Sequence, residues 1–165
     1  MAGPPPEKQL PAPMTMGRPR NFKIEILANF SCWIFYNGEH IGDCHNPYHF
    51  YRFVSLIPRF QKCPVITIKA MAAKNTGYLL GKVKANNKTL LSGSEWKVAS
   101  NVGKDWMSTS YPAKEFSSPS TKTNSGYFSK AAKHFMQKTG AKPVWLSNFA
   151  PQQTAFFRIP VPGCP

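Results

Sequence analysis

The sequence is short of acidic residues. Its 165 residues include 7 Asp and Glu against 21 Lys and Arg, which gives a formal net charge of +14, and no acidic residue follows Glu115. The carboxylates stand singly, which disfavours the clustered oxygen ligands of a calcium site and the paired carboxylates of a glycosidase. Because a strongly basic chain attracts polyanions, we expect an acidic protein surface, a glycan, anionic lipid or nucleic acid as partner.

Signatures of export, membrane insertion and catalysis are also missing. The sequence has no apolar run of about 18 residues, so we expect no membrane span. Its first residues show no charged segment followed by an apolar one, so we expect intracellular synthesis, within a large assembly or a virion. Neither a Gly-x-Ser-x-Gly elbow nor a glycine-rich phosphate loop is present. These absences predict a protein that is not an enzyme and needs no cofactor.

The cysteine spacing matches no metal or redox motif, because the chain contains no CxxC pair. Four cysteines in a chain of this length do not require disulfides, so we favour buried free thiols and leave open a bridge between Cys44 and Cys63. The four positions are Cys32, Cys44, Cys63 and Cys164.

One short segment combines residue types that bind zinc. Cys44, His45 and His49 lie close together in the sequence, with His40 nearby, and thiolate and imidazole are common zinc ligands. Pro47 disfavours the helix that would align the two later histidines. We therefore favour a polar loop over a metal site.

The first 22 residues read as an extended arm. They are rich in proline, which fixes an extended backbone and removes hydrogen-bond donors. The arm includes Pro4, Pro5 and Pro6 and ends with Arg18 and Arg20. We expect residues 1–22 to contact neighbouring subunits and residues 23–165 to form one domain.

The rest of the chain predicts an all-β domain with one short helix. Alternating and compact apolar runs, separated by turn residues such as Asn37-Gly38, are typical of antiparallel strands. The expected strands are 22–26, 31–36, 40–42, 48–56, 64–70, 78–84, 89–91, 96–99 and 154–160. A helical pattern covers 127–136, with Ser125 and Gly140 as its expected caps. Three tryptophans within strand patterns are expected in the core: Trp33, Trp96 and Trp145.

Several of these segments resemble galactose-binding-like jelly rolls, the non-catalytic modules attached to bacterial α-rhamnosidases. The hairpin 33–42, with its Asn-Gly turn, resembles their aromatic-Val-Asn-Gly hairpin. Residues 64–70 and 77–80 are similar to the two strands that follow it. The Ser-Trp-Lys and Phe-Arg motifs of that family have counterparts at 96–100 and 157–158. The likeness extends over roughly residues 22–160, and it implies a jelly-roll β-sandwich and a lectin-like function.

Two sets of side chains are candidates for binding. Aromatic and polar groups near loops can stack on sugars and hydrogen bond to them; these are Asn46, Tyr48, His49, Trp106 and Tyr111. For Trp106 and Tyr111 we favour the alternative that they fix the long segment 100–124 to the domain. The second set can contact polyanions, and it consists of Lys82, Lys84, Lys88, Lys130, Lys133 and Lys138.

These observations leave three functional hypotheses. The first is a structural protein, a basic jelly-roll module that docks into a larger particle such as a capsid or shell. The second is a carbohydrate-binding module, and the third is non-specific binding of nucleic acid or another polyanion.

Overall fold

A computed structural model describes residues 20–46, 48, 50–57, 63–72, 77–122, 128–148 and 152–164, with the backbone alone at 20 and 55–57. The strands are β1 (Arg20–Ala28), β2 (Ser31–Tyr36), β3 (Glu39–Cys44), β4 (Tyr51–Ile57), β5 (Ile66–Met71), β6 (Leu79–Ala85), β7 (Lys88–Leu91), β8 (Lys97–Ala99) and β9 (Thr154–Ile159). The helices within these described residues are one 3-10 turn, η2 (Ala113–Glu115), and one α-helix, α2 (Lys130–Thr139).

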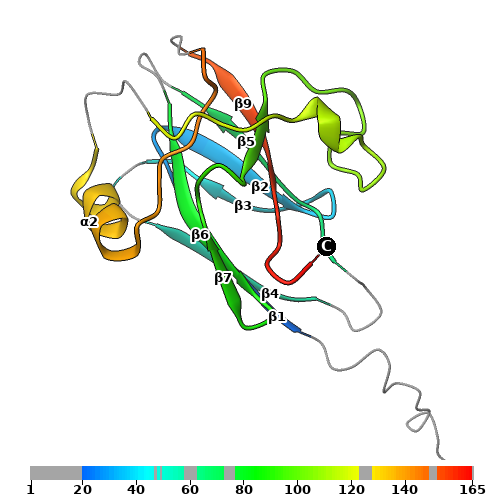
Figure 1. The fold of residues 1–165 in the computed structure, drawn as a ribbon, viewed down its shortest axis with the longest axis horizontal. Coiled ribbons are helices and arrows are strands. Elements are labelled where there is room, and N and C mark those ends of the chain that lie inside the picture. Colours follow the sequence, from blue (N-terminus) through cyan, green and yellow to red (C-terminus); the bar gives the residue numbers. More distant parts are fainter. Residues whose placement is uncertain are drawn as a thin grey trace, which may run out of the picture.

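The strands form two antiparallel sheets (Figure 1). The four-stranded sheet has the order β4-β1-β6-β7, and the five-stranded sheet has the order β3-β2-β5-β9-β8. Alternate side chains of each strand point between the sheets, where Ile24, Ile26, Ile34, Ile68 and Phe157 are fully buried. The predicted all-β sandwich is confirmed, with each expected strand at its place in the sequence. The jelly-roll connectivity stays a prediction.

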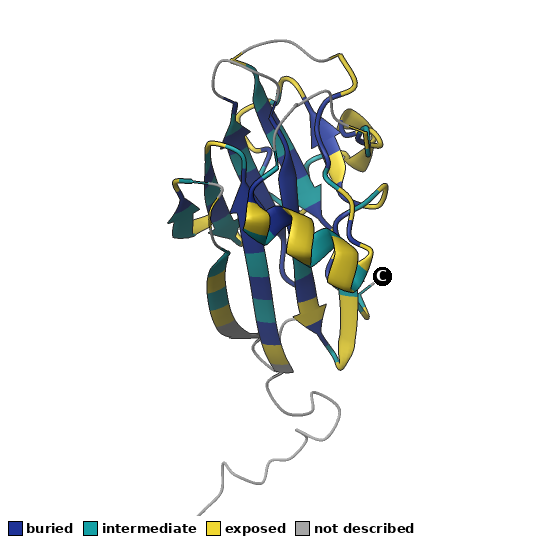
Figure 2. Ribbon diagram, turned by 90° about the vertical axis from the view of Figure 1, so that its left-hand side faces the viewer, coloured by how far each residue is buried: buried dark blue, intermediate teal, exposed yellow. Residues whose placement is uncertain are grey.

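Helix α2 covers part of the outer face of the four-stranded sheet (Figure 2). Its Ala132 packs with Leu27 and Leu80, which point outward from β1 and β6. The Ser129 hydroxyl oxygen accepts a hydrogen bond from the Ala132 amide at 3.1 Å, which satisfies one of the free donors of the first turn. The helix ends at Gly140, whose φ of 81° suits glycine. The predicted cap at Ser125 is wrong, because the helix begins at Lys130; Ser125 itself lies outside the described residues.

The long connection after β8 covers the outer face of the five-stranded sheet. Trp106 and Phe116 are buried there, and the Trp106 ring meets the rings of Phe35 at 6.2 Å and Phe156 at 5.2 Å. Phe35 and Phe156 point outward from β2 and β9, so each sheet has an inner core and a second apolar cluster on its outer face. This segment is irregular, as its Ser, Thr and Pro content predicts.

The cysteine prediction is half correct. Cys32 and Cys44 are buried free thiols, as expected. Cys63, however, forms a disulfide with Cys164, so the free-thiol prediction for this pair and the alternative Cys44–Cys63 bridge are both wrong. Cys44 cannot reach Cys63 because it points into the core beside Cys32, its partner in the β2–β3 register.

Two smaller predictions are corrected. Strand β1 begins at Arg20 and buries Phe22 completely, so the domain begins within the segment that we assigned to the arm. The other arm positions, Pro4, Pro5, Pro6 and Arg18, lie outside the described residues. Trp33 is only half-buried, because its strand position points outward, where Lys69 lies over its ring at 5.6 Å. In the described part of the chain, no helix is long and apolar enough to cross a membrane.

Candidate anion-binding groove

Three charged side chains meet on the outer face of the four-stranded sheet. Glu25 of β1 is paired in the register with Arg52 of β4 on one side and with Lys82 of β6 on the other. Directly paired residues of antiparallel strands point to the same face, here the face that α2 partly covers. The Glu25 carboxylate lies 3.0 Å from Arg52 Nη2 and 3.3 Å from Lys82 Nζ. The carboxylate thus holds both cations against the sheet.

Helix α2 closes this site into a groove of about 380 Å³. Lys23 adds a third cation from β1, two residues before Glu25, and Lys138 and His134 add basic groups from the helix. Phe50 and Phe135 add a pair of aromatic rings to the lining, with ring centroids 4.5 Å apart. The lining therefore combines an apolar aromatic pair with basic side chains.

The electrostatics of the groove favour an anion. Four basic side chains, Lys23, Arg52, Lys82 and Lys138, line the groove together with a single carboxylate, that of Glu25. That carboxylate is 13% exposed, whereas Arg52 is 63% exposed and Lys82 31%. The cationic groups therefore reach the solvent while the acid lies beneath them. A ligand that enters from solvent meets an excess of positive charge.

The environment of Glu25 keeps it ionised. Partial burial raises the pKa of the carboxyl group, but the hydrogen bonds and charges of Arg52 and Lys82 outweigh it, so that the pKa lies below its ordinary value of 4.5. A lowered pKa means that the ionised carboxylate stabilises the folded state. This contribution is complete above the unfolded value and is lost as the pH falls through the folded pKa.

We predict that Glu25→Gln destabilises the protein in a pH-dependent way. At pH 7 the variant should lose about 1 kcal/mol of unfolding free energy, since its partners are partly exposed and screened. The difference from the wild type should shrink as the pH falls below about 4.5, when Glu25 itself becomes protonated. Urea unfolding of both proteins at pH 7 and pH 3 measures this. A difference that does not change with pH would contradict the assigned ion pairs.

The groove contains two of the predicted polyanion contacts, Lys82 and Lys138. Lys84 lines an adjoining hollow on the same face, together with Lys23. Lys88 is exposed at the start of β7, and Lys130 and Lys133 are exposed on α2. The last three are not among the groove-lining residues, so only part of this set is brought together.

The ionisable groove residues that were missed at the sequence level are Lys23, Glu25, Arg52 and His134. Lys23 and Glu25 alternate with Phe22, Ile24 and Ile26, so the pattern does indicate that they share the outer face of β1. Arg52 and His134 lie within segments that read as an aromatic strand and an amphipathic helix. Nothing in those patterns indicates that the two segments lie side by side.

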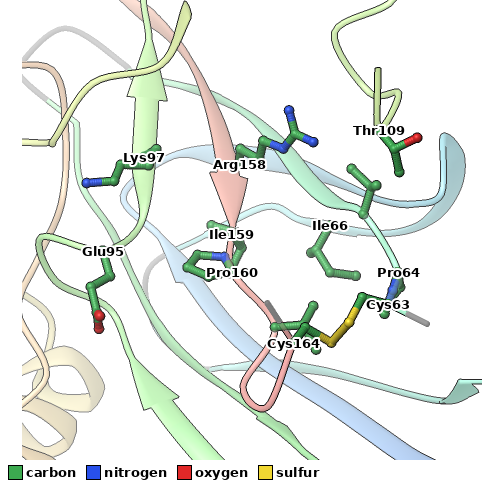
Figure 3. A pocket seen from close by; sticks show the side chains of 12 residues that line it. Cys63, Pro64, Ile66, Glu95, Lys97, Thr109, Arg158, Ile159, Pro160 and Cys164 are labelled. Carbon is green, nitrogen blue, oxygen red and sulfur yellow. A yellow bond between two sulfur atoms is a disulfide. The ribbon is translucent and has the colours of Figure 1, made fainter. Parts of the chain in front are cut away.

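A second hollow of about 380 Å³ lies beside the disulfide (Figure 3). Its walls are largely apolar, with Glu95, Lys97 and Arg158 as the charged groups. Arg158 donates to the Tyr111 carbonyl oxygen at 2.9 Å, and Lys97 donates to the Ser118 hydroxyl oxygen at 3.1 Å. Both cations therefore hydrogen bond to the long connection.

The predicted sugar-binding residues are divided between two segments. Asn46 and the exposed Tyr48 lie between β3 and β4, whereas Trp106 and Tyr111 belong to the connection after β8. Trp106 is 8% exposed, and the Tyr111 hydroxyl oxygen accepts a hydrogen bond from the Gly103 amide at 2.8 Å. Trp106 packs on Phe35 and Phe156 of the sheet, whereas the hydrogen bond of Tyr111 lies within the connection itself. His49 lies outside the described residues.

The candidate zinc ligands do not converge. Cys44 is buried in the core, whereas His40 and His45 are exposed and contact Asp43, His45 at 3.7 Å. Cys44 follows Asp43 on a strand, where successive side chains point to opposite faces. Within the described ranges, no three His, Cys, Asp or Glu side chains are placed to hold a metal ion.

Comparison with known protein families, with curated proteins and with solved structures finds no match for this chain. The resemblance to galactose-binding-like modules therefore rests on the sequence motifs alone. The function has to be argued from the groove.

Proposed function

We propose that this protein is a non-enzymatic docking module, a basic jelly roll that joins a larger assembly by binding an anionic partner in the groove beside α2. The observation that carries the proposal is that Lys23, Arg52, Lys82 and Lys138 line one groove, where Arg52 and Lys82 are held by a single carboxylate. They come from three strands and a helix, so the folded domain holds this cluster in place. The proposal combines the first and third hypotheses drawn from the sequence.

The construction of the groove supports binding. Strands and a packed helix carry its cations, so little of the backbone needs to be ordered when a partner binds. Glu25 fixes Arg52 and Lys82 in the empty groove, which reduces the side-chain entropy lost on binding. Clustered cations on one face also speed association with a polyanion. The proposed contact of residues 1–22 with neighbouring subunits is a separate prediction, because residues 1–19 lie outside the described ranges.

The test is a comparison of two triple variants with the same change in net charge. The groove variant is Lys23→Gln, Lys82→Gln and Lys138→Gln. The control is Lys104→Gln, Lys114→Gln and Lys122→Gln, which changes exposed lysines of the connection after β8. The probes are a labelled heparin oligosaccharide and a labelled single-stranded DNA oligonucleotide, each measured over a series of salt concentrations.

For the probe that the wild type binds more tightly, we expect the groove variant to bind at least about tenfold more weakly. The slope of the logarithm of its affinity against the logarithm of the salt concentration should fall by about two to three, the number of counterions no longer released. The control variant should change the affinity and the slope much less. Equal losses in the two variants would show a diffuse charge effect and contradict the groove as the site. Binding of neither probe by the wild type would overturn the proposal.

A further inference from the structure

We infer that the anionic partner of the groove is a sulfated polysaccharide. This inference rests on the proposed function and specifies its ligand. Three features of the described residues carry it: the disulfide, the lysine-rich set of cations in the groove, and the pair of aromatic rings that lines it.

The disulfide indicates the compartment. Cys63 and Cys164 are bonded across a separation of 101 residues. Such bonds form and persist in oxidising surroundings, such as the cell exterior, and are rare in the cytosol. This revises our expectation of an intracellular location. Sulfated polysaccharides are abundant polyanions outside cells, whereas nucleic acids are concentrated inside them.

The cations of the groove suit sulfate groups on a chain. The Nε and Nη2 atoms of Arg52 both donate to the same carboxylate oxygen of Glu25, at 3.1 and 3.0 Å. This pair uses the Nε–Nη2 edge of the guanidinium, whose Nη1–Nη2 edge can also bind an oxyanion through two hydrogen bonds. Three lysine ammonium groups accompany it in the groove, and they act as point charges that adapt to sulfates at varied positions.

The aromatic pair that lines the groove suits a sugar better than a base. Phe50 and Phe135 pack against each other at 4.5 Å with an angle of 38° between their planes, and both are partly buried. Binding of single-stranded nucleic acid relies on open ring faces on which bases stack. Here each ring partly covers its neighbour. A sugar ring, with apolar C–H groups on its faces and sulfates at its edges, can contact this aromatic pair while the lysines bind the sulfates.

The experiment compares four probes on the wild-type protein at about 150 mM salt, where weak charge effects are screened. They are a heparin oligosaccharide, the same oligosaccharide after chemical desulfation, single-stranded DNA of matched charge, and vesicles containing phosphatidylserine. Heparin should bind at least about tenfold more tightly than DNA. Desulfation should abolish most of the heparin binding, because it removes the sulfate charges whose counterions are released when the protein binds. The groove triple variant should lose the preference for heparin, and the control triple variant should keep it.

The contrary outcomes separate the two proposals. Equal or tighter binding of DNA, or preferred binding of the vesicles, would overturn the sulfated polysaccharide but retain an anion-binding groove if the groove variant still weakens that binding. Desulfated heparin that binds as well as heparin would also overturn it. Absence of binding to all four probes would overturn the inference and the proposed function together.

Discussion

Replacing Cys164 by Ser should lower the unfolding free energy by about 4 kcal/mol, and the melting temperature by about 8 to 16 °C for a domain of this size. The Cys63–Cys164 bond spans 101 residues of sequence, so its loss greatly increases the conformational freedom of the unfolded chain. It also releases the segment after β9 from the start of β5, beside the hollow of Figure 3.

Thermal melting with and without a reducing agent measures this effect. Reductant should destabilise the wild type to the level of Cys164→Ser and should leave the variant unchanged. Cys63→Ser, alone or combined with Cys164→Ser, should match the single variant, because all of them remove the same bond. A wild-type melting temperature that does not respond to reductant under these conditions would show that the bond does not stabilise the fold.

Replacing Gly81 by Ala should cost at least about 3 kcal/mol, at the upper end of the range for an overpacked core. A Cβ atom at Gly81 would lie 2.2 Å from the carbonyl oxygen of Glu25 and 2.9 Å from the Cδ1 atom of Ile26. The carbonyl oxygen belongs to β1, at the centre of the four-stranded sheet, so the added methyl group forces β1 and β6 apart. Because Glu25 is displaced as well, polyanion binding should weaken together with stability.

Gly93→Ala provides the matched control. The nearest atom to a Cβ atom there is the Leu91 carbonyl oxygen at 4.0 Å, and the backbone needs no positive φ. This substitution should be neutral or slightly stabilising, because alanine restricts the unfolded chain more than glycine does. Chemical denaturation of both variants measures the difference. Similar stability of the two variants would contradict the close approach of β1 and β6 at Gly81.

Local patterns explain why the strands could be predicted. Alternation of apolar residues marks β1 and β9, and turn chemistry marks the hairpins: Asn37 and Asn86 both adopt positive φ, at 51° and 53°. Each of these signals lies within a few residues of the structure that it specifies. The helix was found by the same kind of signal, but its start was misplaced because Ser125 and Ser129 are both acceptable caps and only packing distinguishes them.

The features that depend on distant residues could not be predicted in this way. The pairing of Cys63 with Cys164 depends on where the segment after β9 lies in the fold. The spacing of the cysteines in the sequence does not predict that position. The groove depends on the register that places Arg52 beside Glu25, 27 residues away in sequence, and on the packing of α2 over the same sheet. Trp33 was assigned to the core because a strand pattern alone does not say which face is buried.

A lysine acetylation footprint of the protein with and without a heparin oligosaccharide, read by mass spectrometry, tests the groove most directly. Heparin should protect Lys23, Lys82 and Lys138 from acetylation, while the exposed Lys104 and Lys114 of the other face should react as before. Protection spread evenly over all lysines, or concentrated at Lys104 and Lys114, would contradict an anion-binding groove beside α2.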